Sequence, residues 1–149
     1  MINKKRDYIK VYNFDLVCYC MKPVYLVDLV LDKIHELKHE KRPKTIGRDP
    51  NCDYATSLDN RFVSRLQGEI VYRGNQILFR QISENSKTFI GTKDNPYETQ
   101  VFQDVTEEVQ IGNFITMGNN YFFEVRSFRQ VKSQLDEIQD KINEDTVRM

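Results

Sequence analysis

The chain has 149 residues, of which 40% are apolar and 30% charged, a length and balance typical of one soluble globular domain with its own hydrophobic core. Its 22 basic and 22 acidic residues cancel, so composition argues against nucleic acid as a partner. Every apolar run falls short of the roughly eighteen residues that a membrane helix requires. We therefore expect a cytoplasmic protein that binds neither nucleic acid nor membranes.

Residues 1–22 are predicted to form an N-terminal extended arm, because residues 8–21 mix apolar and polar side chains in a way that favours extended structure. Pro23 ends this arm, and the apolar residues 24–31 are predicted to form a first strand. A helix is the alternative, since periodicity does not decide so short a run. Its stripe would comprise Val27, Val30, Leu31, Ile34 and Leu37.

Two later segments each lead from strand-like apolar residues into polar side chains. The first reaches Gly47 and Arg48, and the second reaches Ser64 and Arg65. A guanidinium offers a planar fork of donors that matches two phosphate oxygens, and a serine hydroxyl adds a further bond. Gly47, which has no Cβ, is expected to let the backbone turn and approach a ligand closely. Together the two loops predict an anion-binding pocket.

Short strands separated by turn residues continue as far as residue 125. Residues 68–72 and 77–82 flank a Gly-Asn turn of the kind that joins hairpins. Another short strand is predicted at 88–90, and a final pair at 114–117 and 121–125. The pattern predicts an all-β, two-sheet β-sandwich over residues 23–126.

A C-terminal amphipathic helix is predicted within residues 127–149. Its apolar residues recur at alternating intervals of three and four: Phe128, Val131, Leu135, Ile138 and Ile142. This stripe can pack on the sandwich or on residues 8–21 of the same chain. It can also pair with a second copy of the chain, which would make a homodimer.

Four features, in the correct order over residues 24–125, resemble the forkhead-associated family, whose members are β-sandwich modules that bind phosphothreonine peptides. Residues 46–48 resemble the family's arginine turn, and Asp53 with Leu58 resembles the run that follows it. Residues 63–67 resemble Ser-Arg-x-His before a strand. The remaining two features are residues 83–90, which resemble Ser-x-Asn-Gly-Thr-x-Val, and residues 109–118, which resemble Gly-Asp-x-Ile-x-x-Gly.

This resemblance favours a strand over a helix at 24–31 and implies that Arg48 and Ser64 contact the phosphate, while Arg65 adds charge or peptide contacts. It further implies that an asparagine holds the main chain of the ligand. The loop at 85–88 is one residue longer than the family pattern, so either Asn85 or Ser86 takes that position, depending on where the gap is placed.

Two other positions depart from the family pattern. Gln67 replaces a histidine that supports the loops from behind, and a glutamine amide can substitute for it structurally. Asn113 replaces an aspartate in a structural turn.

The sequence predicts binding and not catalysis. Its three cysteines and two histidines form no zinc-ligand set, and no nucleophile has an adjacent base, so we expect no metal, no cofactor and no enzymatic activity. The resulting hypothesis is a signalling adaptor that binds a phosphothreonine-containing protein or peptide through Arg48, Ser64, Arg65, Asn85 and Ser86. The alternative is a degenerate scaffold that assembles with proteins independently of phosphate through its terminal extensions.

Overall fold

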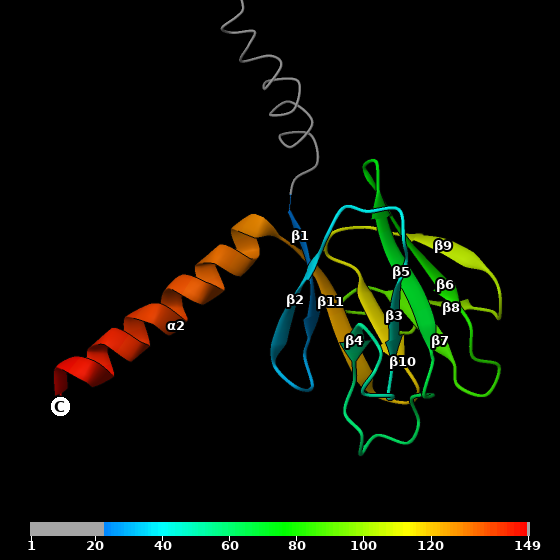
Figure 1. The fold of residues 1–149 in the computed structure, drawn as a ribbon, viewed down its shortest axis with the longest axis horizontal. Coiled ribbons are helices and arrows are strands. Elements are labelled where there is room, and N and C mark those ends of the chain that lie inside the picture. The colour runs from blue at the N-terminus through cyan, green and yellow to red at the C-terminus, as the bar shows by residue number, and fades with distance from the viewer. Residues whose placement is uncertain (1–22, 149) are drawn as a thin grey trace, which may run out of the picture.

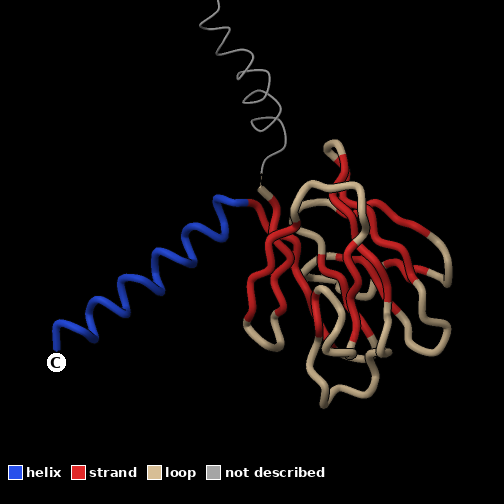
Figure 2. The backbone as a smooth tube through the Cα atoms, viewed as in Figure 1, coloured by secondary structure: helices blue, strands red, loops and turns tan. Residues whose placement is uncertain are grey.

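The computed structural model describes residues 23–148, and within them eleven strands form two sheets that pack face to face, followed by one helix (Figure 1). Figure 2 shows that strands joined by loops make up the sandwich, while the helix follows the last strand. The all-β sandwich with a C-terminal helix is therefore confirmed. The predicted arm, residues 1–22, lies outside the described residues.

The larger sheet has six strands in the order β2-β1-β11-β10-β7-β8, and every pair is antiparallel. β1 and β11 come from opposite ends of the sandwich and pair from Val24 opposite Ser127 to Asp28 opposite Phe123. The strands are β1 (Val24–Asp28), β2 (Lys33–Leu37), β7 (Thr88–Gly91), β8 (Thr99–Val101), β10 (Phe114–Met117) and β11 (Tyr121–Ser127).

The smaller sheet has five strands in the order β4-β3-β5-β6-β9. β3 pairs parallel with β4 and antiparallel with β5, so it lies between these two strands in the sheet. The strands are β3 (Lys44–Gly47), β4 (Tyr54–Ala55), β5 (Gly68–Arg73), β6 (Gln76–Gln81) and β9 (Thr106–Val109).

The hydrophobic core lies between the sheets and follows from strand alternation. Tyr121, Phe123 and Val125 of β11 are all fully buried, while the residues between them face the other side of the sheet. Ile70 of β5 and Phe79 of β6 close the core from the smaller sheet. This packing makes a rigid platform for the loops at its ends.

Residues 24–31 do not form a single strand, which corrects the sequence-based prediction. β1 ends at Asp28, the chain turns through Asp32 with a φ of 56°, and β2 returns antiparallel with Val27 opposite Ile34. The helical alternative, whose stripe runs from Val27 to Leu37, is also wrong, because these residues belong to the same β1–β2 hairpin.

The buried Asp28 carboxylate is the reason that the turn begins where it does. It accepts the backbone N–H groups of Val30 at 2.9 Å and Leu31 at 2.8 Å, and the hydroxyl of Tyr121 at 2.5 Å. A buried carboxylate needs several donors of this kind, and burial with this bond raises the pKa of Tyr121.

The predicted helix is present as α2 (Phe128–Arg148). Ser127 and Gln130 cap it reciprocally: the Gln130 side chain accepts the N–H of Ser127 at 2.9 Å, and the Ser127 hydroxyl accepts the N–H of Gln130 at 3.4 Å. The first turn packs on the sandwich through Val131, which is 1% exposed, and through the Phe128 ring, 6.5 Å from that of Tyr25. Beyond that turn the helix points away from both sheets (Figure 1).

Candidate functional site

The loop after β3 and the segment before β5 lie side by side. Arg48 N–H donates to the carbonyl oxygen of Ser64 at 2.9 Å, and Asp49 N–H donates to that of Arg65 at 3.1 Å. Gly47 is required for this approach, because a Cβ there would lie 2.1 Å from the carbonyl oxygen of Arg65. The glycine thus accommodates the neighbouring segment of the same chain, whereas the sequence had suggested the approach of a ligand.

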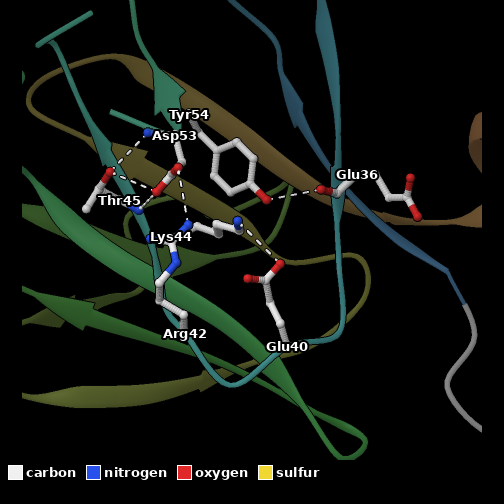
Figure 3. Close-up of polar contacts among 7 residues, drawn as sticks. All are labelled: Glu36, Glu40, Arg42, Lys44, Thr45, Asp53 and Tyr54. Atoms are coloured by element: carbon white, nitrogen blue, oxygen red, sulfur yellow. Dashed lines mark hydrogen bonds and ion pairs between the residues drawn. The ribbon is translucent and has the colours of Figure 1, made fainter. Parts of the chain in front are cut away.

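A carboxylate closes the loop that carries Arg48. Figure 3 shows Asp53, just before β4, reaching back to Thr45 of β3. Asp53 Oδ2 accepts the Thr45 N–H at 2.9 Å and its hydroxyl at 3.1 Å, and the same hydroxyl accepts the Asp53 N–H at 3.0 Å. The backbone N–H of Thr45 lowers the pKa of Asp53, so this brace stays charged at neutral pH.

Flanking polar contacts hold the same corner of the fold (Figure 3). The Tyr54 hydroxyl donates to the carbonyl oxygen of Glu36 at 3.0 Å, which joins β4 to β2 of the other sheet. Burial and nearby carboxylates raise the pKa of Tyr54 to about 12, so the hydroxyl remains a donor. Lys44 Nζ forms an ion pair with Glu40 Oε2 at 3.3 Å, and both side chains are partly exposed.

The Arg48 side chain is held at one end and open at the other. Its Nε donates to the carbonyl oxygen of Val63 at 3.0 Å, which ties the guanidinium to the segment that carries Ser64. Among residues 23–148, no hydrogen bond or ion pair occupies its two terminal nitrogens. Those nitrogens form the side of the fork that binds two oxygens of an oxyanion.

Gln67 joins the segment before β5 to the loop between β6 and β7. It is fully buried, its Oε1 accepts the N–H of Ser64 at 2.9 Å, and its Nε2 donates to the Thr88 hydroxyl at 2.8 Å. Nε2 also lies within hydrogen-bond distance of the carbonyl oxygens of Ser86, at 3.2 Å, and Lys87, at 3.1 Å. The amide therefore fills the supporting place for which the resemblance implied a histidine.

The loop between β6 and β7 supplies the opposite wall. The Ser83 hydroxyl lies 2.5 Å from that of Ser64, and the Ser86 hydroxyl donates to the carbonyl oxygen of Phe62. Ser86 therefore joins the two loops, whereas Asn85 is exposed, and its side-chain amide makes no hydrogen bond to any of residues 23–148. Glu84 in the same loop is also exposed.

These parts surround one open hollow of about 590 Å³. All five residues predicted from the sequence line it: Arg48, Ser64, Arg65, Asn85 and Ser86. Seven further residues complete the lining: Arg61, Phe62, Leu66, Ile82, Ser83, Glu84 and Gln103. Three arginines face a single glutamate, so positive charge exceeds negative charge and favours an anion.

Sequence reasoning missed Arg61, Ser83 and Gln103 as lining residues. The position of Arg61 could have indicated it, because it stands three residues before Ser64 in a turn segment. Gln103 had no such signal, since it belongs to the turn between β8 and β9 and reaches the hollow only through the fold.

A second, mainly apolar hollow of about 570 Å³ adjoins the first and shares Arg61 and Phe62 with it. Val30 of the β1–β2 turn and Asn120 of the β10–β11 turn contribute to its lining. Phe62 is 60% exposed and lines both hollows. An extended ligand can therefore reach both.

The chemistry available in the first hollow is hydrogen-bond donation to an anion. The side chain next to the Ser64 hydroxyl is the hydroxyl of Ser83, which is not a base. Neither histidine lines the hollow: His35 packs on Tyr54, and His39 accepts the N–H of Gly74. The described part of the chain holds no group of three or more residues placed to bind a metal, and no helix in it is long and apolar enough to cross a bilayer.

Comparison with known proteins gives a family match and a fold match. The family profile described as FHA domain matches residues 44–118, which is half of the chain. The N-terminal FHA domain of S. cerevisiae Rad53p, solved with a phosphothreonine peptide, has 20% identity and a TM-score of 0.56, covering 74% of this chain and 98% of that one. No curated protein sequence matches.

Two further solved structures share the fold. The FHA domain of CT664 from Chlamydia trachomatis has 16% identity and a TM-score of 0.56, covering 71% of this chain and 98% of that one. Rad53 1–466, solved with AMP-PNP, has 20% identity and a TM-score of 0.59 over 76% of this chain. Only 32% of that longer chain is covered. At these identities the likeness concerns the fold alone.

Proposed function

The chain belongs to the FHA-domain family, and from this membership we propose that it is a signalling adaptor that binds phosphothreonine peptides in the hollow beside Arg48 and Ser64. FHA domains are generally interaction modules without catalysis, and they generally bind phosphothreonine peptides. One observation carries the proposal for this chain: Arg48, whose terminal nitrogens are open, and Ser64 line the same hollow, in which positive charge is in excess.

The chemistry of a phosphorylated threonine fits that arrangement. A phosphomonoester carries nearly two negative charges and three acceptor oxygens at neutral pH. Arg48 supplies a bidentate donor and Ser64 a short hydroxyl bond, while Arg65 and Arg61 add positive charge at the rim. The side-chain amide of Asn85, which also lines the hollow, is suited to hydrogen bonds with the main chain of a peptide. Ser86 stabilises the loop between β6 and β7 by donating to the carbonyl oxygen of Phe62.

The test compares phosphorylated peptides with their unphosphorylated twins. In fluorescence anisotropy titrations with a phosphothreonine peptide library, we expect binding only of phosphorylated members. Arg48→Ala should weaken it by about 1.5–3 kcal/mol, because charged hydrogen bonds are lost. Arg129→Ala, on the exposed side of α2, is the matched control and should change nothing. Equal affinity for both twins, or full affinity of Arg48→Ala, would contradict the proposal.

Assembly through the C-terminal helix is a second candidate function. It is favoured because α2 continues away from the sandwich after Val131, while its sequence maintains the spacing of an apolar seam (Figure 1). In this role the sandwich serves as a scaffold and its partner is a second copy of the chain or another protein.

The oligomeric state tests this second function. Light scattering of the whole chain should give twice the monomer mass of 17.7 kDa, falling to one mass in Leu135→Glu combined with Ile138→Glu, because charges interrupt the seam. A monomer at every concentration, with no partner recovered, removes the support for assembly.

A further inference from the structure

A hydroxyl that was not among the predicted binding residues is hydrogen-bonded to Ser64. The Oγ atoms of Ser64 and Ser83 lie 2.5 Å apart, and both residues are half-buried. The distance alone does not tell which oxygen carries the shared hydrogen, because a hydroxyl can donate or accept. The neighbours of Ser83 decide it.

Two backbone amides occupy the acceptor positions of Ser83. Its Oγ accepts the N–H of Asn85 at 3.2 Å and the N–H of Ser86 at 3.1 Å. A hydroxyl oxygen has two lone pairs and one hydrogen. With both lone pairs engaged, the hydroxyl of Ser83 can only donate its hydrogen, and the acceptor that the described residues place within hydrogen-bond distance is Ser64 Oγ.

Ser64 therefore accepts from Ser83 and retains its own hydrogen for another acceptor. Its backbone is fixed at the same time, since its N–H donates to Gln67 and its carbonyl oxygen accepts from Arg48. Among residues 23–148, its Oγ makes no hydrogen bond other than that to Ser83. The free hydrogen belongs to a residue that lines the same hollow as Arg48.

We propose that Ser83 is a positioning residue that orients the Ser64 hydroxyl as a donor, so that the hollow selects an oxyanion over a ligand group that must itself donate. The inference rests on the proposed function, because it assigns the phosphate of a phosphothreonine as the acceptor. Donation from Ser83 also polarises the Ser64 hydroxyl, which strengthens its bond to the anion.

These hydrogen bonds also connect the loop between β6 and β7 to the phosphate-binding hydroxyl of Ser64. Ser83 caps that loop through Asn85 and Ser86 and meets Ser64 on the facing loop with its remaining hydrogen. The shape of one loop is thereby linked to the hydrogen-bond direction of the other.

The experiment is a double-mutant cycle on the full chain, with blocked phosphothreonine, N-acetyl-phosphothreonine N-methylamide, as the probe and NMR shift titration as the readout. Ser64→Ala should lower affinity about tenfold or more, and Ser83→Ala severalfold, because a charged hydrogen bond is lost or weakened. In the Ser64→Ala background, Ser83→Ala should have no further effect on affinity. Ser83→Thr keeps the hydroxyl and should restore binding.

A second readout separates hydroxyl direction from loop shape. The second pKa of the bound phosphate, followed by phosphorus NMR, should rise in Ser83→Ala, because a donor that favours the dianion is weakened. An equal loss from Ser83→Ala in both backgrounds, or an unchanged phosphate pKa, would show that Ser83 only caps its loop and would overturn the inference. If folded wild-type protein binds neither the probe nor any phosphorylated library peptide, both proposals fail together.

Discussion

Buried polar side chains determine the geometry of the hollow. Gln67 has no exposed surface, yet both ends of its amide are bonded, one to Ser64 and the other to Thr88 and the adjoining backbone. Removing a group of this kind leaves several donors and acceptors unpaired, which costs more than the bonds themselves contribute. An amide thus holds two loops together without a titratable group, so this support does not change with pH.

His35 is the residue through which mild acid should act on stability. Burial lowers the pKa of its imidazole, partly offset by Asp28 and reinforced by Lys33. The folded state therefore binds its proton less readily than the unfolded state, whose ordinary histidine pKa is about 6.5. The contribution of neutral His35 to the free energy of unfolding is therefore fully present above pH 6.5, and it is lost as the pH falls through the lower pKa of the folded state.

Urea unfolding at pH 7 and pH 5 measures this dependence. We expect the wild-type free energy of unfolding to decrease between the two, and His35→Phe, which keeps a ring against Tyr54 at 5.0 Å but cannot titrate, to decrease less. Asp53, whose pKa is lowered, acts at still lower pH, since its stabilising charge is lost only below the ordinary aspartate range. An identical slope for wild type and variant would contradict this prediction.

At the scale of elements, the close contact between the loop after β3 and the segment before β5 brings the predicted site residues together. Arg48, Val63 and Ser64 meet because backbone bonds run between these segments, and Gly47 leaves room for them. Residue chemistry was sufficient to pick out both segments, since arginine, serine and glycine have recognisable uses. It was insufficient for the β1–β2 turn, whose position depends on Tyr121, 93 residues away from Asp28.

Gly47→Ala should separate these elements. The added methyl group would meet the carbonyl oxygen of Arg65 at 2.1 Å, so the two segments must move apart, at a cost of about 1–3 kcal/mol of stability. Affinity for a phosphothreonine peptide should fall as well, because Arg48 moves away from Ser64. Thermal unfolding and anisotropy titration measure the two effects.

Gly74→Ala is the control for this variant. Gly74 has a φ of 65° in the β5–β6 turn, and an added Cβ there would meet no atom within 4 Å. Its replacement should lower stability through backbone strain and leave affinity unchanged. If Gly47→Ala behaves in the same way as this control, the close contact does not determine binding.

For the whole molecule, the balance of 22 basic and 22 acidic residues leaves no net positive charge to attract an anion. The attraction must come from the local excess of arginine around the hollow. Charges of this exposed kind are screened over a Debye length, which is about 10 Å at 0.1 M salt and about 3 Å at 1 M. Binding should therefore depend on salt through a few side chains and not through the net charge.

The dissociation constant of a phosphothreonine peptide should rise as salt increases from about 0.05 to about 0.5 M, because screening weakens the arginine contacts. Arg61→Ala and Arg65→Ala should each reduce the slope, whereas Arg73→Ala, outside the hollow, should not. Anisotropy titrations across a salt series measure these slopes. A constant dissociation constant would mean that charge contributes little to recognition.

The sequence by itself determined the all-β sandwich with most of its later strands, the C-terminal helix, and the five residues that line one hollow. These follow from local rules, because side-chain alternation, turn residues and helical spacing involve neighbours in the chain. Only the tertiary structure decided that Ser83 bonds to Ser64, that Gln103 reaches the hollow and that β1 ends at Asp28. Those features depend on hydrogen bonds and contacts between distant segments, which no local pattern encodes.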